Sequence, residues 1–425
     1  MIERLYEHQE RGARFLRSPG RNKAALFFEV GTGKTNTAIS AVNELPKGKL
    51  LILAPASVIH GMWEHYDDLP IKHDYTLMTY EMLSRHKEYT KLSWDYIICD
   101  ECHKLKSVKS KVSKYVKVLS ARAKICWGLT GTPIATDFCD IHGIFTALSI
   151  DEFNMGADTF MHRYYQCKVV FSGPNYMIYK PQKLLPGAME ELTTRIAKHA
   201  MTLRSEDCVD LPGVTVKQIP VAGMNGPEYK EIAKSIVQQG SDQPDKVVNK
   251  LVQIGKLHQA ANGFVYNEQK VAIPFEKNPK LDIFKMLIQM VLEERDRVIV
   301  IYEYVYDYTK LTEVLDSLGI TYTNDHIGFE FNQVLLMQEA SAIGINLQKY
   351  TSCMIYYSYS YSYLEYDQSF GRIYRMGQAR PCEVYFMVSS NTIEQKIAKV
   401  VMDRVALDEA VKELLVALTN EAETV

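Results

Sequence analysis

The chain has 425 residues, of which 47% are apolar and 24% are charged. Lys and Arg number 49 and Asp and Glu number 51, for a formal net charge of -2, so a nucleic-acid site has to be a local feature. The length predicts two or three domains, and the composition excludes a disordered chain, a collagen-like chain and a disulfide-stapled miniprotein.

The first part of the chain contains short β-branched stretches that alternate with helical patterns. These predicted strands are Lys23 to Val30, Lys49 to Ala56, Tyr75 to Tyr80, Trp94 to Cys99 and Lys124 to Leu129. Alternation of strands with helices is typical of a parallel sheet covered by helices. We therefore expect an α/β lobe in this part of the chain.

A glycine-rich segment joins the first predicted strand to a helical pattern. Its residues are Gly31, Thr32, Gly33, Lys34 and Thr35. Glycines allow backbone N–H groups to close around phosphates, and the following helix presents its positive N-terminus to the same charge. We expect Lys34 to contact the β and γ phosphates of a nucleotide and the Thr35 hydroxyl to ligate Mg²⁺. Phe28 stands where this pattern usually has its first glycine.

Two adjacent acids, Asp100 and Glu101, follow the apolar strand that contains Ile97 and Ile98. Nucleotide hydrolysis uses one carboxylate on the Mg²⁺ ion and a second one that orients or deprotonates the attacking water. Both are expected at the carboxyl end of a strand beside the phosphate loop. We assign Asp100 to the metal and Glu101 to the water.

Cys99 and Cys102 form a CxxC pattern with His103 next to it, which is also compatible with zinc. A structural zinc site needs four ligands, and the chain has no second CxxC pattern and no HxxxH pattern. Because strand side chains point to alternate faces, we expect Cys99 to lie in the core.

The segment from Cys102 to Thr136 contains no acidic residue but many basic ones. They are Lys104, Lys106, Lys109, Lys111, Lys114, Lys117, Arg122 and Lys124. Apolar residues with helical spacing lie among them, at Val112, Tyr115, Val116 and Leu119. A helix that buries this stripe leaves Lys111, Lys114 and Lys117 in solvent. Two interpretations remain, a surface that binds nucleic-acid phosphates and an ordinary charged surface.

The middle of the chain has a different pattern. Gln166 to Lys183 contains two short polar and aromatic strands around a turn, which predicts a hairpin. Gly226 to Gln239 and Lys246 to Asn262 have helical periodicity, and a turn-rich segment separates them. We interpret this stretch as a hinge or a small helical insert.

A second alternating series follows the middle stretch. Its predicted strands are Arg297 to Tyr304, Gln333 to Gln338, Ser352 to Tyr357 and Cys382 to Val388. After the third of these strands, Ser358 to Tyr363 alternates serine with tyrosine. These tyrosines could stack on nucleic-acid bases, or they could form one face of an edge strand or a loop.

The two series and the middle stretch divide the chain into three parts. Residues 1–205 form a predicted N-terminal lobe with the hairpin at about 165–183, and residues 206–275 form a helical linker or insert. Residues 276–425 form a predicted C-terminal lobe with a final helix.

The sequence gives no indication of secretion or membrane insertion. Met1 to Gly12 lack the apolar core of a signal peptide, and no apolar run reaches the roughly 18 residues that span a bilayer. The eight cysteines lack the dense spacing of a disulfide framework. We expect a soluble cytoplasmic protein with reduced thiols and no membrane partner.

Several of these segments resemble motifs of the superfamily-two helicase-like ATPases. They are GTGKT at Gly31 to Thr35, DECH at Asp100 to His103, LTGTP at Leu129 to Pro133 and QSFGRIYRMGQ at Gln368 to Gln378. The last motif resembles the Swi/Snf branch in particular. The same branch is indicated by LYEHQ at Leu5 to Gln9, APAS at Ala54 to Ser57 with Trp63 downstream, MTYEML at Met78 to Leu83 and SAIGINL at Ser341 to Leu347.

This resemblance implies two RecA-like lobes that bind ATP between them and hold duplex DNA across both. Gln9 would then contact adenine, Gly344 and Gln368 would belong to the nucleotide site, and Thr130 and Thr132 would couple nucleotide state to lobe closure. Arg372 and Arg375 would act as arginine fingers, since a permanently charged planar guanidinium spreads over the oxygens of the transferring phosphate.

The chain also departs from the family pattern. Residues 320–333 form a shorter connection than the family has, so we expect a helix of the second lobe to be missing or trimmed. The accessory domains of chromatin remodellers are also absent, which favours a compact bacterial or phage form, in the host cytoplasm if viral.

The sequence leaves three functions open. The first is an ATP-driven motor that tracks along double-stranded DNA without separating its strands, which the QSFGRIYRMGQ motif favours. The second is a strand-separating DNA or RNA helicase. The third is a clamp in which ATP sets the affinity for nucleic acid without directed movement, which the presence of Glu101, Arg372 and Arg375 disfavours.

Overall fold

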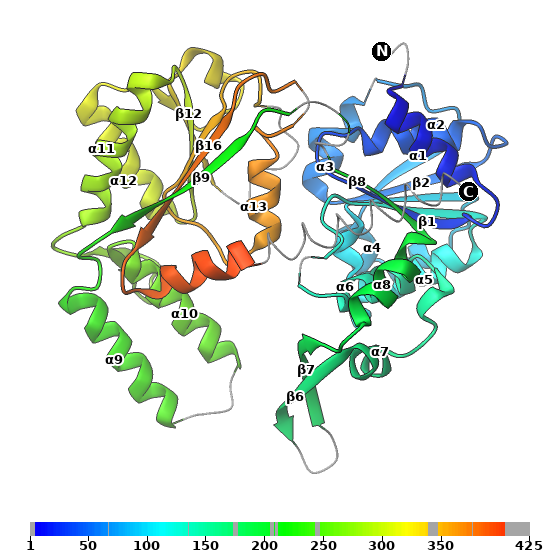
Figure 1. The fold of residues 1–425 in the computed structure, drawn as a ribbon, viewed down its shortest axis with the longest axis horizontal. Coiled ribbons are helices and arrows are strands. Elements are labelled where there is room, and N and C mark those ends of the chain that lie inside the picture. The colour runs from blue at the N-terminus through cyan, green and yellow to red at the C-terminus, as the bar shows by residue number, and fades with distance from the viewer. Residues whose placement is uncertain are drawn as a thin grey trace. The chain divides into compact units, whose positions relative to one another are not determined.

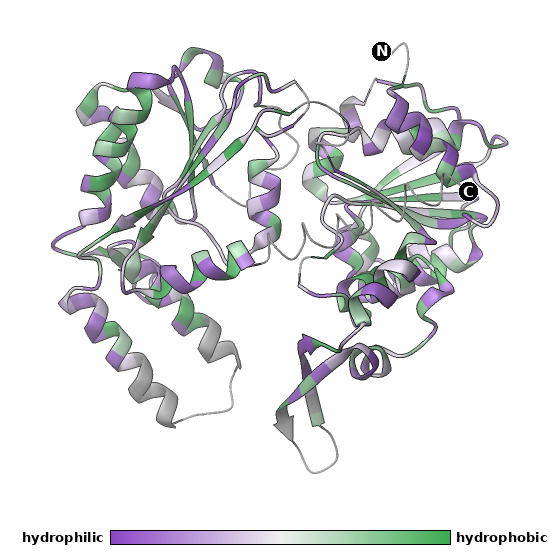
Figure 2. Ribbon diagram, in the orientation of Figure 1, coloured by the Kyte–Doolittle hydropathy of each residue, from purple (hydrophilic) through white to green (hydrophobic). Residues whose placement is uncertain are grey.

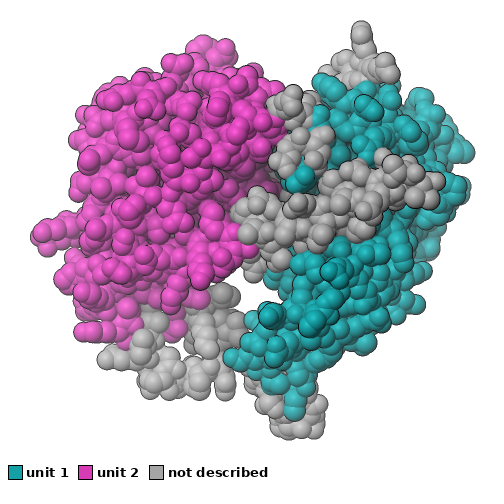
Figure 3. Space-filling view, in the orientation of Figure 1, with its two compact units in different colours: residues 1–210, 406–425 teal, residues 211–405 magenta. Residues whose placement is uncertain are grey.

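A computed structural model describes residues 5–66, 68–134, 136–172, 177–204, 208, 211–242, 247–338, 347–375 and 377–403. The described residues form two compact units (Figures 1 and 3), of which unit 1 lies within Met1–Asp210 and unit 2 within Leu211–Val405. None of the helices in these ranges has the length and apolar character needed to cross a membrane.

Unit 1 is built on a six-stranded parallel sheet with the strand order β3-β2-β4-β5-β1-β8. Its strands are β1 (Lys23–Phe28), β2 (Lys49–Ala54), β3 (Asp74–Thr79), β4 (Tyr96–Asp100), β5 (Ile125–Leu129) and β8 (Ala200–Leu203). The central strands are apolar over nearly their whole length (Figure 2), because helices cover both faces of the sheet. The five strands predicted in this part of the chain are confirmed.

Helices and short 3-10 turns surround this sheet. The helices are α1 (Glu7–Arg17), α2 (Lys34–Asn43), α3 (Ala56–Gly61), α4 (Tyr80–Arg85), α5 (Lys111–Arg122), α6 (Cys139–Ala147), α7 (Ala157–Tyr164) and α8 (Ala188–Ala197). The turns are η1 (Trp63–His65), η2 (Lys87–Lys91), η3 (Cys102–Leu105) and η4 (Asp151–Phe153). Strands β6 (Tyr165–Ser172) and β7 (Met177–Leu184) form the predicted antiparallel hairpin, whose turn residues 173–176 lie outside the described ranges.

Unit 2 contains a second six-stranded parallel sheet, with the order β13-β14-β12-β15-β16-β9. Its strands are β9 (Val214–Val221), β12 (Val298–Tyr302), β13 (Tyr322–Thr323), β14 (Val334–Gln338), β15 (Cys353–Tyr356) and β16 (Cys382–Ser389). The four strands predicted for the second series are confirmed, and the chain has the expected α/β class with two six-stranded parallel sheets.

Helices cover both faces of the unit 2 sheet, whereas the first two helices of the unit project away from the sheet (Figure 1). The helices of unit 2 are α9 (Pro227–Asp242), α10 (Val247–Ala261), α11 (Pro279–Glu294), α12 (Val305–Leu318), α13 (Tyr363–Phe370) and residues 393–403. Because side chains alternate along β12, Val298 and Val300 pack with α11 and α12, whereas Ile299 and Ile301 pack with α13 and the final helix. The part of the predicted C-terminal helix beyond residue 403 lies outside the described ranges.

The stretch predicted as a helical linker, residues 206–275, contains more than helices. It includes α9 and α10 and the short antiparallel pair β10 (Phe264–Tyr266) and β11 (Ala272–Pro274). It also includes β9, which pairs with β16 at the edge of the unit 2 sheet. Between β13 and β14 the chain forms only the 3-10 turn η6 (Gly328–Phe331), in keeping with the expected loss of a helix.

A buried ion pair joins three helices of unit 2. The Lys280 ammonium on α11 lies 2.6 and 2.9 Å from the two carboxylate oxygens of Glu394, and both side chains are completely buried. Asn262, at the end of α10, accepts from Lys280 Nζ at 2.8 Å and donates to Glu394 Oε1 at 3.1 Å. The Ser389 N–H donates to the other carboxylate oxygen at 2.8 Å. The charges are therefore both paired and hydrogen-bonded, as burial requires.

This network stabilises unit 2 at neutral pH. Burial raises the pKa of Glu394, but the Lys280 ammonium and further donors outweigh that effect and lower the pKa from 4.5 to about 2. Because the folded-state pKa is the lower one, the stabilisation is present above about pH 4.5 and is lost as the pH falls toward 2.

We expect Lys280→Met to destabilise the chain by about 3 to 5 kcal/mol, because it leaves the Glu394 carboxylate buried without its counter-ion. Lys285→Met is the matched control, since Lys285 lies exposed on the same helix and should change stability by less than about 0.5 kcal/mol. Urea unfolding followed by circular dichroism gives both values. Equal midpoints for the two variants would contradict the assignment.

Candidate nucleotide-binding site

The predicted phosphate loop lies between the end of β1 at Phe28 and the start of α2 at Lys34. Gly31 and Gly33 have φ angles of 87° and 82°, a left-handed conformation that glycine adopts without strain. A Cβ atom on Gly33 would collide with the side chain of Gln9. The N-terminus of α2 has no side-chain cap, so no N-cap side chain competes with a ligand for its first backbone N–H groups.

Helix α1 holds the predicted adenine-binding residue against this loop. Gln9 Nε2 donates to the Thr32 carbonyl oxygen at 3.2 Å, and the neighbouring His8 Nε2 donates to the same oxygen at 3.0 Å. Burial lowers the pKa of His8, which favours the neutral ring. Gln9 Oε1 accepts from the Tyr6 N–H at 3.1 Å, so the amide is fixed at both ends. No local sequence pattern indicates this contact of His8.

The two predicted acids lie at the same edge of the sheet as the loop. Asp100 ends β4 and the loop follows β1, and the single strand β5 lies between these two parallel strands. Lys34 is close enough to Asp100 to stabilise its ionised form, although its ammonium also donates to the Glu29 carbonyl oxygen at 3.4 Å. Thr35 is half-buried on the first turn of α2.

The Asp100 carboxylate is buried and held by two donors. Trp63 Nε1 donates to Oδ2 at 3.0 Å, and the Glu101 N–H donates to Oδ1 at 3.0 Å. The Tyr80 hydroxyl donates to the Asp100 backbone carbonyl at 2.8 Å. Burial and then the Glu101 carboxylate raise the pKa of Asp100 to about 6, against the opposing effect of Lys34.

Glu101 has a left-handed backbone, with φ 50° and ψ 51°, which is uncommon for a residue with a side chain. Its Oε2 lies 3.1 Å from His103 Nδ1 and 3.5 Å from the Thr130 hydroxyl. His103 Nδ1 also lies 3.0 Å from Thr130 Oγ1, which accepts from the Thr132 N–H at 3.2 Å. The acid that we assigned to the water is thus in contact with Thr130 of the LTGTP motif, which is bonded in turn to Thr132.

The cysteines next to the acids lie in the core. Cys99 and Cys102 are fully buried in the hydrophobic cluster of unit 1, as predicted for Cys99. Burial raises the pKa of the Cys102 thiol well above its usual value, which disfavours the thiolate that zinc requires. The Nδ1 atom of His103 contacts both Glu101 and Thr130.

The predicted residues of unit 2 lie around α13. Gln368 is half-buried on this helix, Arg372 follows it with 6% of its surface exposed, and burial lowers the pKa of Arg375. Gly344 lies outside the described ranges. Gln378, the last residue of the motif, donates to the carbonyl oxygens of Thr351 and Ile373 at 3.0 Å each and so fixes the turn after the arginines.

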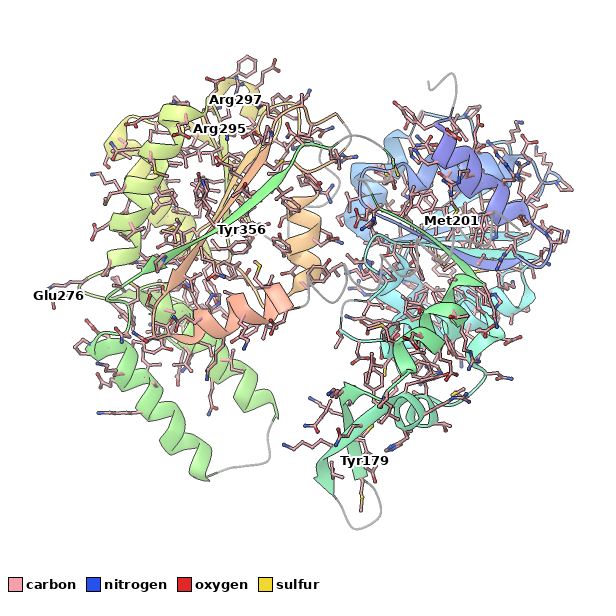
Figure 4. All side chains as sticks on the ribbon, viewed as in Figure 1. Tyr179, Met201, Glu276, Arg295, Arg297 and Tyr356 are labelled. Atoms are coloured by element: carbon pink, nitrogen blue, oxygen red, sulfur yellow. The ribbon has the colours of Figure 1, made fainter. Side chains whose placement is uncertain are left out.

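The serine-tyrosine repeat belongs to the core of unit 2. Tyr359 and Tyr363 are 1% and 5% exposed, which prevents their rings from stacking on a base. The repeat follows β15, whose Tyr356 lies inside the unit (Figure 4) and stacks on Phe386 with ring centroids 4.5 Å apart. Tyr361 is half-buried. The base-stacking interpretation is therefore wrong for the two buried rings.

Helix α5 presents the predicted basic surface. Val116 and Leu119 are buried, whereas Lys111, Lys114 and Lys117 are exposed. Lys114 and Lys117 line a groove of about 590 Å³ that extends to His142 on α6 and to the first residues of α7. Not all cations of this segment are available, since Lys124 Nζ lies 2.9 Å from an Asp95 oxygen.

Known proteins resemble this chain. Residues 63–197 match the SNF2-related domain. A SWI/SNF-related matrix-associated actin-dependent regulator of chromatin, subfamily A member 1, from Mus musculus is 22% identical over 475 residues, which cover 96% of this chain and 43% of that protein. An uncharacterized ATP-dependent helicase, YqhH, of Bacillus subtilis is 24% identical over 448 residues, 92% of this chain and 76% of that protein.

A solved structure of the Sulfolobus solfataricus SWI2/SNF2 ATPase core in complex with dsDNA has 22% sequence identity, a TM-score of 0.43, and coverage of 99% of this chain and 95% of that chain. The resemblance to the Swi/Snf branch is confirmed by the SNF2-related domain and by the relatives. This chain spans less than half the length of the mouse relative.

We expect Gly33→Ala to weaken nucleotide binding, because the new Cβ displaces Gln9 and strains the loop. Gly20→Ala is the matched control: Gly20 has a similar φ of 81°, but a Cβ there meets no atom within 4 Å. Both variants should lose about 1 kcal/mol of stability from the left-handed backbone, and only Gly33→Ala should affect binding of a fluorescent ATP analogue. Equal affinities for the analogue would contradict this account of the loop.

Proposed function

We propose that this chain, which carries an SNF2-related domain, is an ATP-hydrolysing motor that moves along double-stranded DNA. The observation that carries the proposal is the convergence of the glycine-rich loop, Gln9 and the acid pair at one edge of the unit 1 sheet. A cytoplasmic location, in a host cell if the chain is viral, is part of the same proposal.

In this proposal unit 1 supplies the groups that bind and hydrolyse ATP. The backbone of Gly31 to Gly33 and the N-terminus of α2 surround the phosphates, with Lys34 as their counter-ion. Gln9, held over the loop, contacts the adenine. Glu101 orients and deprotonates the attacking water, and its contact with His103 holds that carboxylate in place.

Mg²⁺ would be held by Thr35 and Asp100 in this site. The residues fit the ion, because hydroxyl and carboxylate oxygens are the ligands that Mg²⁺ prefers, and each Asp100 oxygen keeps a lone pair beyond its hydrogen bond. When bound, the ion would neutralise charge on the phosphate oxygens.

Unit 2 would complete the site. We propose that Arg372 and Arg375 stabilise the charge that develops on the transferring phosphate, and that Gln368 and Gly344 contribute to nucleotide binding. Such arginines raise the rate of phosphoryl transfer by about 10³ to 10⁵ in other enzymes. Thr130, which contacts both Glu101 and His103, would transmit the state of the nucleotide.

The proposed track is the phosphate backbone of duplex DNA. Lys111, Lys114 and Lys117 on α5 form an exposed basic face next to a groove. Phosphate contacts carry no sequence information, so two lobes that grip the backbone alternately can move along any duplex. The names of the relatives, a regulator of chromatin and an ATP-dependent helicase, support a nucleic-acid partner.

We expect duplex DNA to stimulate ATP hydrolysis more than single-stranded DNA or RNA, as measured by steady-state ATPase assays in parallel.

Lys34→Ala should abolish ATP binding, whereas Glu101→Gln should keep binding and lose turnover. The reason is that Lys34 holds the phosphates, whereas Glu101 serves only the reaction. Wild-type turnover in Glu101→Gln would remove Glu101 from the mechanism.

Strand displacement assays distinguish the alternatives. A translocase displaces the third strand of a DNA triplex and leaves a forked duplex intact. Efficient unwinding of the fork would identify a strand-separating helicase. ATP-dependent binding without triplex displacement would identify a nucleotide-gated clamp.

We expect the triple variant Lys111→Ala, Lys114→Ala, Lys117→Ala to weaken DNA binding equally for all sequences. Each lost phosphate contact should reduce the slope of log affinity against log salt by about 0.9. The matched control neutralises Lys47, Lys49 and Lys72, which are also exposed but lie at the amino-terminal ends of β2 and β3. If both triple variants have the wild-type slope, α5 is an ordinary charged surface.

A further inference from the structure

The segment that follows α3 contacts two parts of the candidate nucleotide site. These are the acid Asp100 and the helix α2, which follows the glycine-rich loop. Trp63 opens the turn η1, is 3% exposed, and donates its indole N–H to Asp100 Oδ2 at 3.0 Å. The indole has one donor and no acceptor, so this bond uses its whole hydrogen-bonding capacity. Trp63 therefore holds one oxygen of the carboxylate that we assign to Mg²⁺.

The same segment is bonded to the helix that follows the phosphate loop. The Tyr66 hydroxyl donates to Asn36 Oδ1 at 2.8 Å, and Asn36 Nδ2 donates to Asp68 Oδ2 at 3.1 Å. Asn36 lies directly after Thr35 in α2 and is largely buried. The Trp63 and Tyr66 rings are in contact, with centroids 5.3 Å apart, so the two hydrogen bonds belong to one packed unit.

We propose that Trp63 is a positioning residue for the metal-binding carboxylate, and that Tyr66 extends this function to Thr35 through Asn36. The Trp63 bond and the Glu101 N–H fix the two Asp100 oxygens, so the carboxylate plane cannot rotate. The Tyr66 bond fixes the start of α2. The segment 63–66 thereby sets the separation of the two groups that would share the ion, a role that rests on the proposed function.

A purely structural role for Trp63 makes a different prediction. Phenylalanine could fill most of the same space, so a packing role would survive Trp63→Phe, whereas a positioning role requires the N–H. Removal of a residue that orients a metal ligand typically lowers the affinity for the metal by 10- to 100-fold. The consequence should therefore appear in the Mg²⁺ requirement for nucleotide binding.

The test measures binding of a non-hydrolysable ATP analogue by calorimetry over a series of Mg²⁺ concentrations and in EDTA. In Trp63→Phe we expect the Mg²⁺ concentration for half-maximal binding to rise about 10- to 100-fold, with affinity in EDTA unchanged. Tyr66→Phe should also raise this Mg²⁺ concentration, but by a smaller factor, because Tyr66 acts on Thr35 only through Asn36.

Trp127→Phe is the matched control. Trp127 is in the same unit, is fully buried, and donates its indole N–H at 3.0 Å to the carbonyl oxygen of Arg21, in the segment between α1 and β1. This variant loses an indole hydrogen bond of the same length without touching Asp100. Its Mg²⁺ requirement should equal that of the wild-type chain.

The outcomes separate the two proposals. A wild-type chain that binds the analogue without any effect of Mg²⁺, or not at all, would overturn the proposed function. A wild-type chain with a clear Mg²⁺ requirement that Trp63→Phe leaves unchanged would overturn only the positioning role. If circular dichroism shows that Trp63→Phe does not fold, Tyr66→Phe decides in the same way, and an unchanged requirement in that variant rejects the inference.

Discussion

A carboxylate that is removed from water must receive hydrogen bonds, and the arrangement around Asp100 follows from this requirement. Its two oxygens are bonded to Trp63 and to the backbone of Glu101, and its own carbonyl accepts from Tyr80. These partners come from different segments of unit 1, so one buried acid connects the turn after α3, the end of β4 and helix α4. Burial and the Glu101 carboxylate raise its pKa, whereas Lys34 and these hydrogen bonds oppose the rise.

The parallel sheet explains why the other groups are near this acid. In parallel strands all carboxyl ends lie at one edge, and the loops that leave this edge are neighbours regardless of their distance in the sequence. The glycine-rich loop leaves β1, the acid pair leaves β4, and the LTGTP motif leaves the strand between them. The contact of Glu101 with Thr130 is a direct consequence of this order.

Most of the sheets could be predicted because their strands are apolar runs of five or six residues between helical patterns. β8 was not predicted, since its four residues have no pattern of their own and become a strand only by pairing with β1. β9 was not predicted either, because as an edge strand it is mostly polar or exposed and lies in a stretch dominated by helices. Short and edge strands depend on partners that are distant in the chain.

The candidate site also combines features that follow from local sequence with contacts between residues that are distant in the chain. Gly31 to Thr35 and Asp100 to His103 are local patterns, and their chemistry can be inferred from neighbouring residues. The bonds of His8 to Thr32 and of Trp63 to Asp100 join residues 24 and 37 positions apart, and no local pattern indicates them. Composition alone left two interpretations open for the tyrosines after β15, and burial decides against base stacking for Tyr359 and Tyr363, which lie in a core.

The buried pair of Lys280 and Glu394 also determines where unit 2 can be shortened. Lys280 lies near the start of α11, and Glu394 lies 114 positions later, in the last helix that the structure describes. A fragment cut before this helix would retain the whole sheet but leave an ammonium group in an apolar interior. For unit 2, the boundary of an independently folding piece is therefore set by a charge and not by the last strand.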